Sequence, residues 1–372
     1  MVNPFQSIFF ISVGTPVFDV GLLAALSSVV TALMYLIGGY VADTWGRRRV
    51  IVTFSFVAAA NAFFYFFIKS WTFLFIPVTV GAISGIYTPA FNATLNDSFD
   101  PELRPKGFAS FTIVTTIPSV FAPYLGGLLM DHFGYVPGLK TGYFVSGLLG
   151  VLGVTYRALK LKETHRPERV RVGILGFLKG IINENVSAIR AASIPAKRLV
   201  LYSAISSVAS GFSTVYVSLY LINGLHVSSS EYGLLTGLSA LITIFLLMPA
   251  VRLIKRIGLK KTSVLSALSS PVSMLVFVSA NGMNDLIAWS VTGGVSGAIL
   301  SPSIQSLQGN YVPKHIRGRL MAMFNVVPLL VTTPAQVLAG YMYAYVSHVA
   351  PFIISFPFYA YSVYILTKLE RQ

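Results

Sequence analysis

Long uncharged stretches, separated by short clusters of charged residues, dominate the chain. A membrane-spanning helix needs about 20 predominantly apolar residues. The uncharged intervals run over residues 20–42, 50–68, 70–96, 107–130, 141–156, 199–230, 232–251, 262–284 and 286–313, and then over 320–367, which is long enough for two helices. This pattern predicts an all-α polytopic membrane protein with eleven complete spans.

The first residues depart from this pattern. The apolar run FQSIFFISV, residues 5–13, is too short to cross a hydrocarbon core of about 30 Å. We therefore expect a partial first transmembrane helix. A mis-assigned coding start or a fragment is the preferred explanation, since a genuine half-helix would leave unpaired backbone groups in lipid.

The second half of the chain repeats the first. GLLAALS, residues 21–27, recurs as GLLTGLS, residues 233–239, and Gly46 corresponds to Gly258 by the same shift. A period of this length with several apolar spans inside it indicates duplication of a whole helical bundle. We predict two pseudo-symmetric six-helix bundles, residues 1–160 and 198–372, joined by a linker, residues 161–197.

Positive charge is concentrated on one side of the expected membrane. The chain has 27 Lys and Arg against 12 Asp and Glu, a net charge of +15. If the loop after Gly46 is cytoplasmic, alternation of the spans leaves only Lys69 and Lys140 of the basic residues outside. This is the asymmetry of the positive-inside rule, so the charge indicates orientation in a bilayer and not nucleic-acid binding. We expect a multi-pass protein of the cell membrane with the linker and the C-terminus in the cytoplasm.

The linker contains one patterned segment. Residues 171–192, RVGILGFLKGIINENVSAIRAA, carry apolar side chains at helical spacing. The pattern favours an amphipathic helix on the inner membrane face, with Lys179 and Arg190 near anionic headgroups. An unpatterned linker is the alternative.

The connection between the second and third expected helices reads GGYVADTWGRRR, residues 38–49. It resembles the major facilitator superfamily signature G-x-x-x-D-[RK]-x-G-[RK]-[RK], with Thr44 in place of the usual basic residue. The matching positions are Gly39, Asp43, Gly46, Arg47 and Arg48. The duplication, the number of spans and the second-half echo KRIGLKK, residues 255–261, fit the same family. The resemblance implies a secondary transporter of two six-helix bundles that rock around a midplane site.

The resemblance also implies a cytoplasmic latch. In the family the motif aspartate contacts the start of helix eleven, and an arginine pairs with an acidic residue at the end of helix four, where Asp97 is the match. A carboxylate is stabilised at a helix N-terminus, and guanidinium groups bind carboxylates or lipid phosphates. The glycines at 38 and 39 are expected to permit close helix approach. For Arg48 the alternative is that it only enforces orientation.

Two further segments match each other across the repeat. Residues 89–107 and 302–319 resemble the connections after helix four and helix ten of the family, each with a proline turn followed by an arginine, Arg104 or Arg317. Asp97 corresponds to Asn310, so only the first half keeps the acidic partner. We expect an asymmetric gate.

By resemblance, helices one, four, seven and ten form the substrate site. The uncharged polar residues that this placement selects are Gln6, Tyr87, Asn92, Tyr216, Tyr220, Gln305 and Asn325. Amides and tyrosines offer hydrogen bonds and aromatic faces to a neutral or amphipathic ligand. For each of them, helix packing or a place in the interfacial aromatic belt is the alternative.

The acidic residues all fall at span ends or in loops, so no intramembrane proton relay is evident. A coupling proton would need Asp19, Asp97 or a residue before Met1. The histidines are scattered, and no phosphate loop or nucleophile motif occurs, so we expect no metal, cofactor or catalytic group. The chain has no cysteine, which excludes thiol chemistry.

These observations together predict a monomeric carrier of a small organic solute in the lipid bilayer. Efflux or facilitated movement of a neutral or amphipathic molecule is the first interpretation, and sugar or metabolite uptake is the second. A transport-inactive membrane sensor or scaffold is a third, favoured by the partial first helix and by Thr44.

Overall fold

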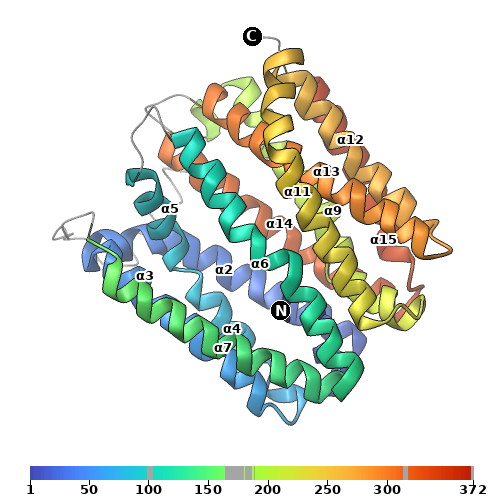
Figure 1. The fold of residues 1–372 in the computed structure, drawn as a ribbon. Helices are drawn as coiled ribbons and strands as arrows, with labels where there is room; N and C mark the ends of the chain where they lie inside the picture. The colour runs from blue at the N-terminus through green and yellow to red at the C-terminus, as the bar shows by residue number, and fades with distance from the viewer. Residues whose placement is uncertain (99–103, 164–179, 181–186, 188, 313–316, 370–372) are drawn as a thin grey trace.

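The computed structural model describes residues 1–98, 104–163, 180, 187, 189–312 and 317–369, and within them the regular elements are all helices (Figure 1). Eleven spans in these residues are long and apolar enough to cross a membrane, and the short helix α1 precedes them. The prediction of eleven complete spans after a partial first helix is therefore confirmed. The amphipathic helix expected over residues 171–192 lies largely outside the described residues.

The first bundle contains α1 to α7. Its helices are α1 (Gln6–Ser12), α2 (Val17–Trp45), α3 (Arg47–Phe67), α4 (Phe75–Ser84), α5 (Tyr87–Asp97), α6 (Arg104–Phe133) and α7 (Tyr135–Lys160). Helices α4 and α5 together form one span, interrupted at Gly85. Two 3₁₀ turns, Asn3–Phe5 and Trp71–Phe73, begin the first and fourth spans.

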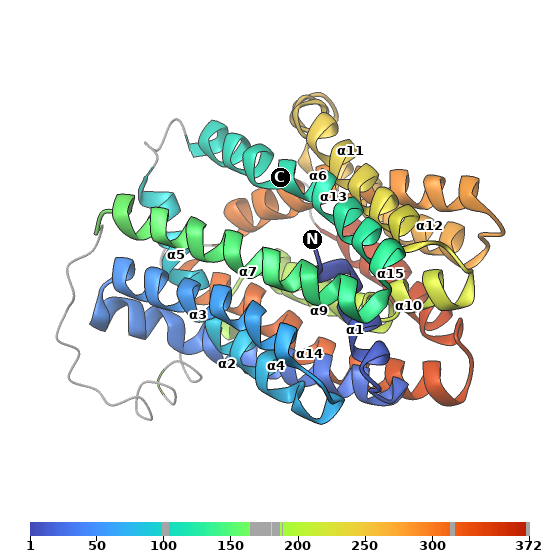
Figure 2. The same cartoon turned by 60° about the horizontal axis from the view of Figure 1, so that its bottom comes forward.

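The second bundle contains α9 to α15. Its helices are α9 (Ile194–Ser213), α10 (Val217–Leu219), α11 (Ser229–Ile257), α12 (Leu259–Val278), α13 (Met283–Tyr311), α14 (Arg317–Tyr345) and α15 (Ala350–Thr367). A π-helical turn, Tyr220–Gly224, continues α9 and α10 into one span. In Figure 2 the two bundles lie against each other with their long helices roughly aligned.

We name the two ends of the molecule after residues that mark them. The Arg47 end carries the α2–α3 connection and the end of α5, and the Asp131 end carries the end of α6 and the start of α11. Glycines with positive φ break the chain between consecutive helices at the Arg47 end, with φ of 89° at Gly46 and 86° at Gly258. Only glycine adopts this backbone conformation readily, which explains why the repeat keeps glycine at both positions.

Large apolar side chains cover the outside of the bundles. Phe67, Leu149 and Phe245 are more than half exposed, as are many other residues on the outward faces. A water-soluble protein rarely leaves so much contiguous apolar surface uncovered, whereas hydrocarbon solvates it. The surface fits a protein that is surrounded by lipid.

The bundles meet along two helix crossings, α6 with α11 and α2 with α14. Glycine lies at the crossing point of all four helices: Gly21 of α2 faces Gly340 of α14, Gly127 of α6 faces the Ser229 backbone, and Gly233 of α11 faces the Pro123 backbone. A Cβ at any of these positions would come closer to a backbone atom than real Cβ atoms do. All four glycines lie toward the Asp131 end. The halves are therefore in backbone contact at that end.

These crossings predict a large difference between two helical glycines. Gly233→Ala should push α11 from α6 and lower the unfolding temperature by several degrees. Gly293→Ala on α13 meets only Ser239 Oγ at 3.6 Å, an ordinary contact, and should be neutral or stabilising, since alanine favours a helix over glycine by about 1 kcal/mol. Thermal unfolding of both variants in detergent checks this. Equal unfolding temperatures would contradict the close crossing.

Candidate functional site

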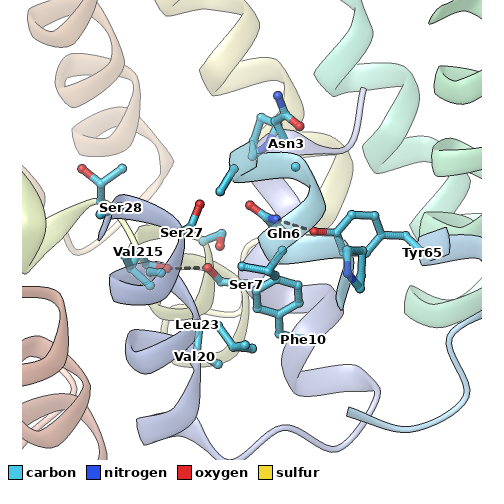
Figure 3. A pocket seen from close by; sticks show the side chains of 18 of the residues that line it. Asn3, Gln6, Ser7, Phe10, Val20, Leu23, Ser27, Ser28, Tyr65 and Val215 are labelled. Carbon is cyan, nitrogen blue, oxygen red and sulfur yellow. Dashed lines mark hydrogen bonds between the residues drawn. The ribbon is translucent and has the colours of Figure 1, made fainter. Parts of the chain in front are cut away.

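A cavity of about 530 Å³ lies between the two bundles, toward the Asp131 end (Figure 3). It is lined by the Asn3–Phe5 turn and α1, α2, α3, α4 and α7 of the first bundle. The second bundle contributes α10, α11, α14 and the residues just before α10. The described lining residues carry no charge, and about half of them are serine, threonine, tyrosine or side-chain amides. The described lining can therefore hydrogen-bond a ligand, and it offers an ion no opposite charge.

Hydrogen bonds fix the side chains around this cavity. Gln6 Nε2 donates to the Tyr65 hydroxyl at 3.3 Å, and the Tyr65 ring stacks on Tyr143 with centroids 4.5 Å apart. Two further bonds join the bundles: Ser7 Oγ donates to the Val215 carbonyl at 2.7 Å, and Ser28 Oγ donates to Gln336 Oε1 at 2.9 Å. In Figure 3 Gln6 points toward Tyr65 and Ser7 toward Val215, and a dashed line marks each hydrogen bond. The walls come from both bundles, so a relative movement of the bundles changes the cavity.

Two further cavities continue the first one into the second bundle. The next, of about 370 Å³, shares Thr214 and Tyr232 with the first. The third, of about 430 Å³ between α13 and α14, shares Ser296 and Gly297 with the second. The described lining of both is uncharged. The three cavities thus neighbour one another through shared lining residues, and their described lining is uncharged.

Three of the predicted ligand-binding residues line these cavities. Gln6 lies in the first, while Gln305 and Asn325 lie together in the third. Tyr87 and Asn92 lie on α5, outside the described lining of all three cavities. The Tyr87 ring instead contacts Phe91, with centroids 6.5 Å apart.

The structure places the two predicted tyrosines of the seventh span in helix packing. Tyr216 is fully buried, donates its hydroxyl to the Val17 carbonyl at 3.1 Å and stacks on Tyr343. Tyr220 packs against Phe277 and Phe352. Sequence position alone did not separate these tyrosines from cavity residues, because both environments accept an aromatic ring.

Most residues that line the main cavity were not singled out in the sequence, among them Asn61 and Tyr65 on α3 and Gln336 on α14. The family placement put the site on helices one, four, seven and ten, so neither of these helices was expected to form it. A signal was present for the two amides, because each lies within a predominantly apolar span. Side-chain amides inside a membrane usually hydrogen-bond across helices or to a ligand.

The motif arginines fasten three helix ends of the first bundle together at the Arg47 end. Arg47 Nη1 lies 2.5 Å from Asp97 Oδ2 at the end of α5. The Arg48 guanidinium donates to the Ala158 and Leu161 carbonyls at 2.7 Å each, and its backbone N–H donates to the Glu163 carboxylate. Arg48 therefore caps the C-terminal end of α7, where a cation is favoured by the helix dipole.

The second bundle repeats this cap. Lys260, the repeat equivalent of Arg48, donates its ammonium group to the Leu369 carbonyl beyond α15. Arg198 at the start of α9 donates to the neighbouring Lys368 carbonyl. Each bundle thus holds the end of its last helix with a basic side chain from the motif region.

The structure gives less detail for the remaining residues of the predicted latch and its glycine pair. Asp43 is exposed near the end of α2, and the side chains of Arg104 and Arg317, at the starts of α6 and α14, lie outside the described ones. The close approach expected of the glycine pair occurs at Gly38, where a Cβ would meet the Ile86 carbonyl oxygen at 2.5 Å. A Cβ on Gly39 would meet no described heavy atom within 4 Å, so the structure gives Gly39 no packing role.

At the opposite end, one carboxylate joins the two bundles. Asp131, near the end of α6, accepts hydrogen bonds from the backbone N–H groups of Ser229 at 3.0 Å and Ser230 at 2.9 Å. These groups begin α11, and an anion there also interacts favourably with the helix dipole. The repeat equivalent of Asp131 in α14 is Ala344. This clamp therefore occurs at only one of the two crossings.

Comparisons with known proteins agree on the fold. The family model described as Major Facilitator Superfamily matches residues 1–203 and 199–371. An uncharacterized MFS-type transporter of Methanocaldococcus jannaschii is 20% identical, over 87% of this chain and 81% of that protein. A Na⁺, Li⁺, K⁺/H⁺ antiporter of Planococcus maritimus is 31% identical, over 41% of this chain and 37% of its own length.

Solved structures resemble the whole chain. The crystal structure of the nucleoside transporter NupG superposes with a TM-score of 0.73 at 12% identity, covering 100% of this chain and 95% of that one. At this identity the likeness concerns the fold.

The Arg48 cap predicts a ranking of stabilities. Arg48→Gln should destabilise the first bundle more than Asp97→Asn, because it removes two charge-assisted bonds to helix-end carbonyls. The Arg47–Asp97 pair is half exposed on the Asp97 side, at 49%, and such pairs contribute about 0.2–1 kcal/mol. Thermal unfolding of both variants, with Arg49→Gln as the charge-matched neighbour, measures this. Equal effects of Arg48→Gln and Arg49→Gln would leave Arg48 with a purely orienting role.

Proposed function

The chain belongs to the Major Facilitator Superfamily, and on that premise we propose that it carries a small uncharged organic solute across the membrane by alternating access. The observation that supports this most directly is the uncharged cavity of about 530 Å³, whose walls come from both bundles. Rocking of two bundles around such a cavity exposes it to one side of the membrane at a time.

We propose that the Arg47 end faces the cytoplasm. Arg47, Arg48, Lys260 and Lys368 gather there, and basic residues favour the cytoplasmic side. The Asp131 end then faces outside, and the glycine crossings together with Asp131 close the cavity on that side. This arrangement corresponds to a conformation that is sealed toward the exterior.

The polar contacts divide into two groups that rocking affects differently. Arg47–Asp97 and Arg48–Leu161 lie within the first bundle, so they move with it as one body. The bonds from Ser229 and Ser230 to Asp131 cross between bundles, and they must break when the outer side opens. We therefore assign Asp131 to an outer clamp.

The cavity lining also bears on the class of solute. One relative is named as a monovalent cation/H⁺ antiporter, and a solved structure with the same fold is titled a nucleoside transporter. Intramembrane ion and proton sites usually contain carboxylates or histidine. The described lining of the cavities contains neither, which favours an uncharged organic solute over a cation.

Alternating access can be tested by thiol labelling, because the chain has no cysteine of its own. A single cysteine replacing Ser27, which lines the cavity, should react slowly with a membrane-impermeant reagent added outside. Asp131→Ala removes two charge-assisted hydrogen bonds from the closed conformation. It should accelerate external labelling about tenfold, which corresponds to about 1.4 kcal/mol.

Asp285→Ala provides the matched control. Asp285 accepts a hydrogen bond from the Asn281 N–H at the start of α13, within the second bundle. Removing it changes the charge by the same amount at the same end of the molecule, but breaks no hydrogen bond between the bundles. Equal acceleration by both variants, or no labelling from either side of the membrane in any variant, would refute the outer clamp and favour a protein that does not switch.

A further inference from the structure

Resting on the proposed transport of an uncharged solute, we propose that α3 supplies the substrate-selecting subsite. Asn61 and Tyr65 are one helical turn apart and both line the main cavity. The solute class that fits them is a small neutral molecule with at least one O–H or N–H donor, such as a polyol, a nucleoside or an amide. An apolar or amphipathic molecule without such a donor does not satisfy this subsite.

Asn61 carries a buried hydrogen-bond acceptor without a partner. The residue is only 6% exposed, and its Nδ2 donates to the Pro77 carbonyl at 2.9 Å. Because a carbonyl can only accept, this bond fixes which way the amide is oriented. Among the described residues, Asn61 Oδ1 finds no donor. A buried acceptor left unpaired is unfavourable, so a hydrogen bond from a ligand donor to this oxygen would stabilise the bound ligand.

A glycine makes room for this amide. A Cβ on Gly81 of α4 would lie 3.0 Å from Asn61 Nδ2, and Gly81 itself lines the cavity. Any larger side chain at this position would press on the amide that the Pro77 carbonyl holds. The neighbouring helix thus fits the Asn61 side chain in one orientation.

Tyr65 adds a donor to the acceptor of Asn61. Its hydroxyl accepts from Gln6 Nε2, which leaves the phenolic proton available for a ligand. Stacking on Tyr143 holds the ring in place. Residues four apart on a helix have Cβ atoms about 5–6 Å apart. Both side chains line the same cavity, so the subsite offers an acceptor and a donor to one small molecule.

This pairing determines selectivity as well as binding. A site that is built to hydrogen-bond a substrate group strongly rejects the analogue that lacks it, because its own buried groups then stay unpaired. The uncharged lining also disfavours charged molecules, which would lose hydration without gaining a counter-charge. The subsite thus favours the polar metabolite interpretation over an amphipathic drug.

The test measures binding and flux with defined probes. The purified chain is screened by thermal shift with uridine, D-glucose, uridine monophosphate and tetraphenylphosphonium, and then by counterflow of the stabilising probe in proteoliposomes. We expect stabilisation by uridine or D-glucose and not by the two ions. Asn61→Leu should raise the probe concentration at half-saturation at least tenfold, and Gly81→Ala should raise it less. Asn281→Leu, which replaces an exposed amide in a loop, should leave this concentration unchanged.

The outcomes separate this proposal from the proposed function. Unfolding temperatures without probe show whether each variant is folded, and external labelling of the Ser27→Cys chain shows whether the bundles still switch. If the bundles switch, the α3 subsite alone is overturned by any of three results. These are stabilisation by tetraphenylphosphonium alone, no stabilisation by any probe, and unchanged binding of uridine or D-glucose by folded Asn61→Leu. Absence of switching overturns the proposed function itself.

Discussion

Close approach of helix backbones at the Asp131 end is the constraint on which the rest of the architecture depends. In lipid, helices gain little from burying apolar side chains against each other, so association relies on close packing and hydrogen bonds. Gly21 and Gly340 allow it at one crossing, and Gly127 and Gly233 allow it at the other. Because Gly21 and Gly233 occupy the same position in the repeat, duplication of one bundle created both crossings.

The cavity follows from this contact geometry. Helices held together near one end enclose a space beside that contact, and α1, α2, α11 and α14 contribute polar side chains to its lining. Among the described residues, the polar bonds that cross between the bundles each contribute about 0.5–1.5 kcal/mol. Two conformations that differ by a few such bonds remain close in free energy. A ligand that prefers one of them can therefore shift the equilibrium even at modest affinity.

Apolar intervals and the repeat were sufficient to predict the spans, and the glycines at 46 and 258 marked the breaks between helices. The Arg47–Asp97 contact also follows the motif. The faces of the helices were harder to predict, because both lipid and the bundle interior accept apolar residues. Tyr216 therefore could not be distinguished from a cavity residue, and Asn61 lies on a helix that the family placement left outside the site. The role of Arg48 as a helix cap depends on the Ala158 and Leu161 carbonyls, whose positions only the fold reveals.

The central claim is that the two bundles rock as rigid bodies about the cavity. Electron–electron distance measurements in nanodiscs test it, with spin labels at Phe73 and Val346 for the Asp131 end and at Trp45 and Lys261 for the Arg47 end, all exposed positions in a chain without cysteine. The account predicts two distance populations for each pair, with the fraction of long distances at one end equal to the fraction of short distances at the other. A single population at both ends, or lengthening at both ends together, would contradict it.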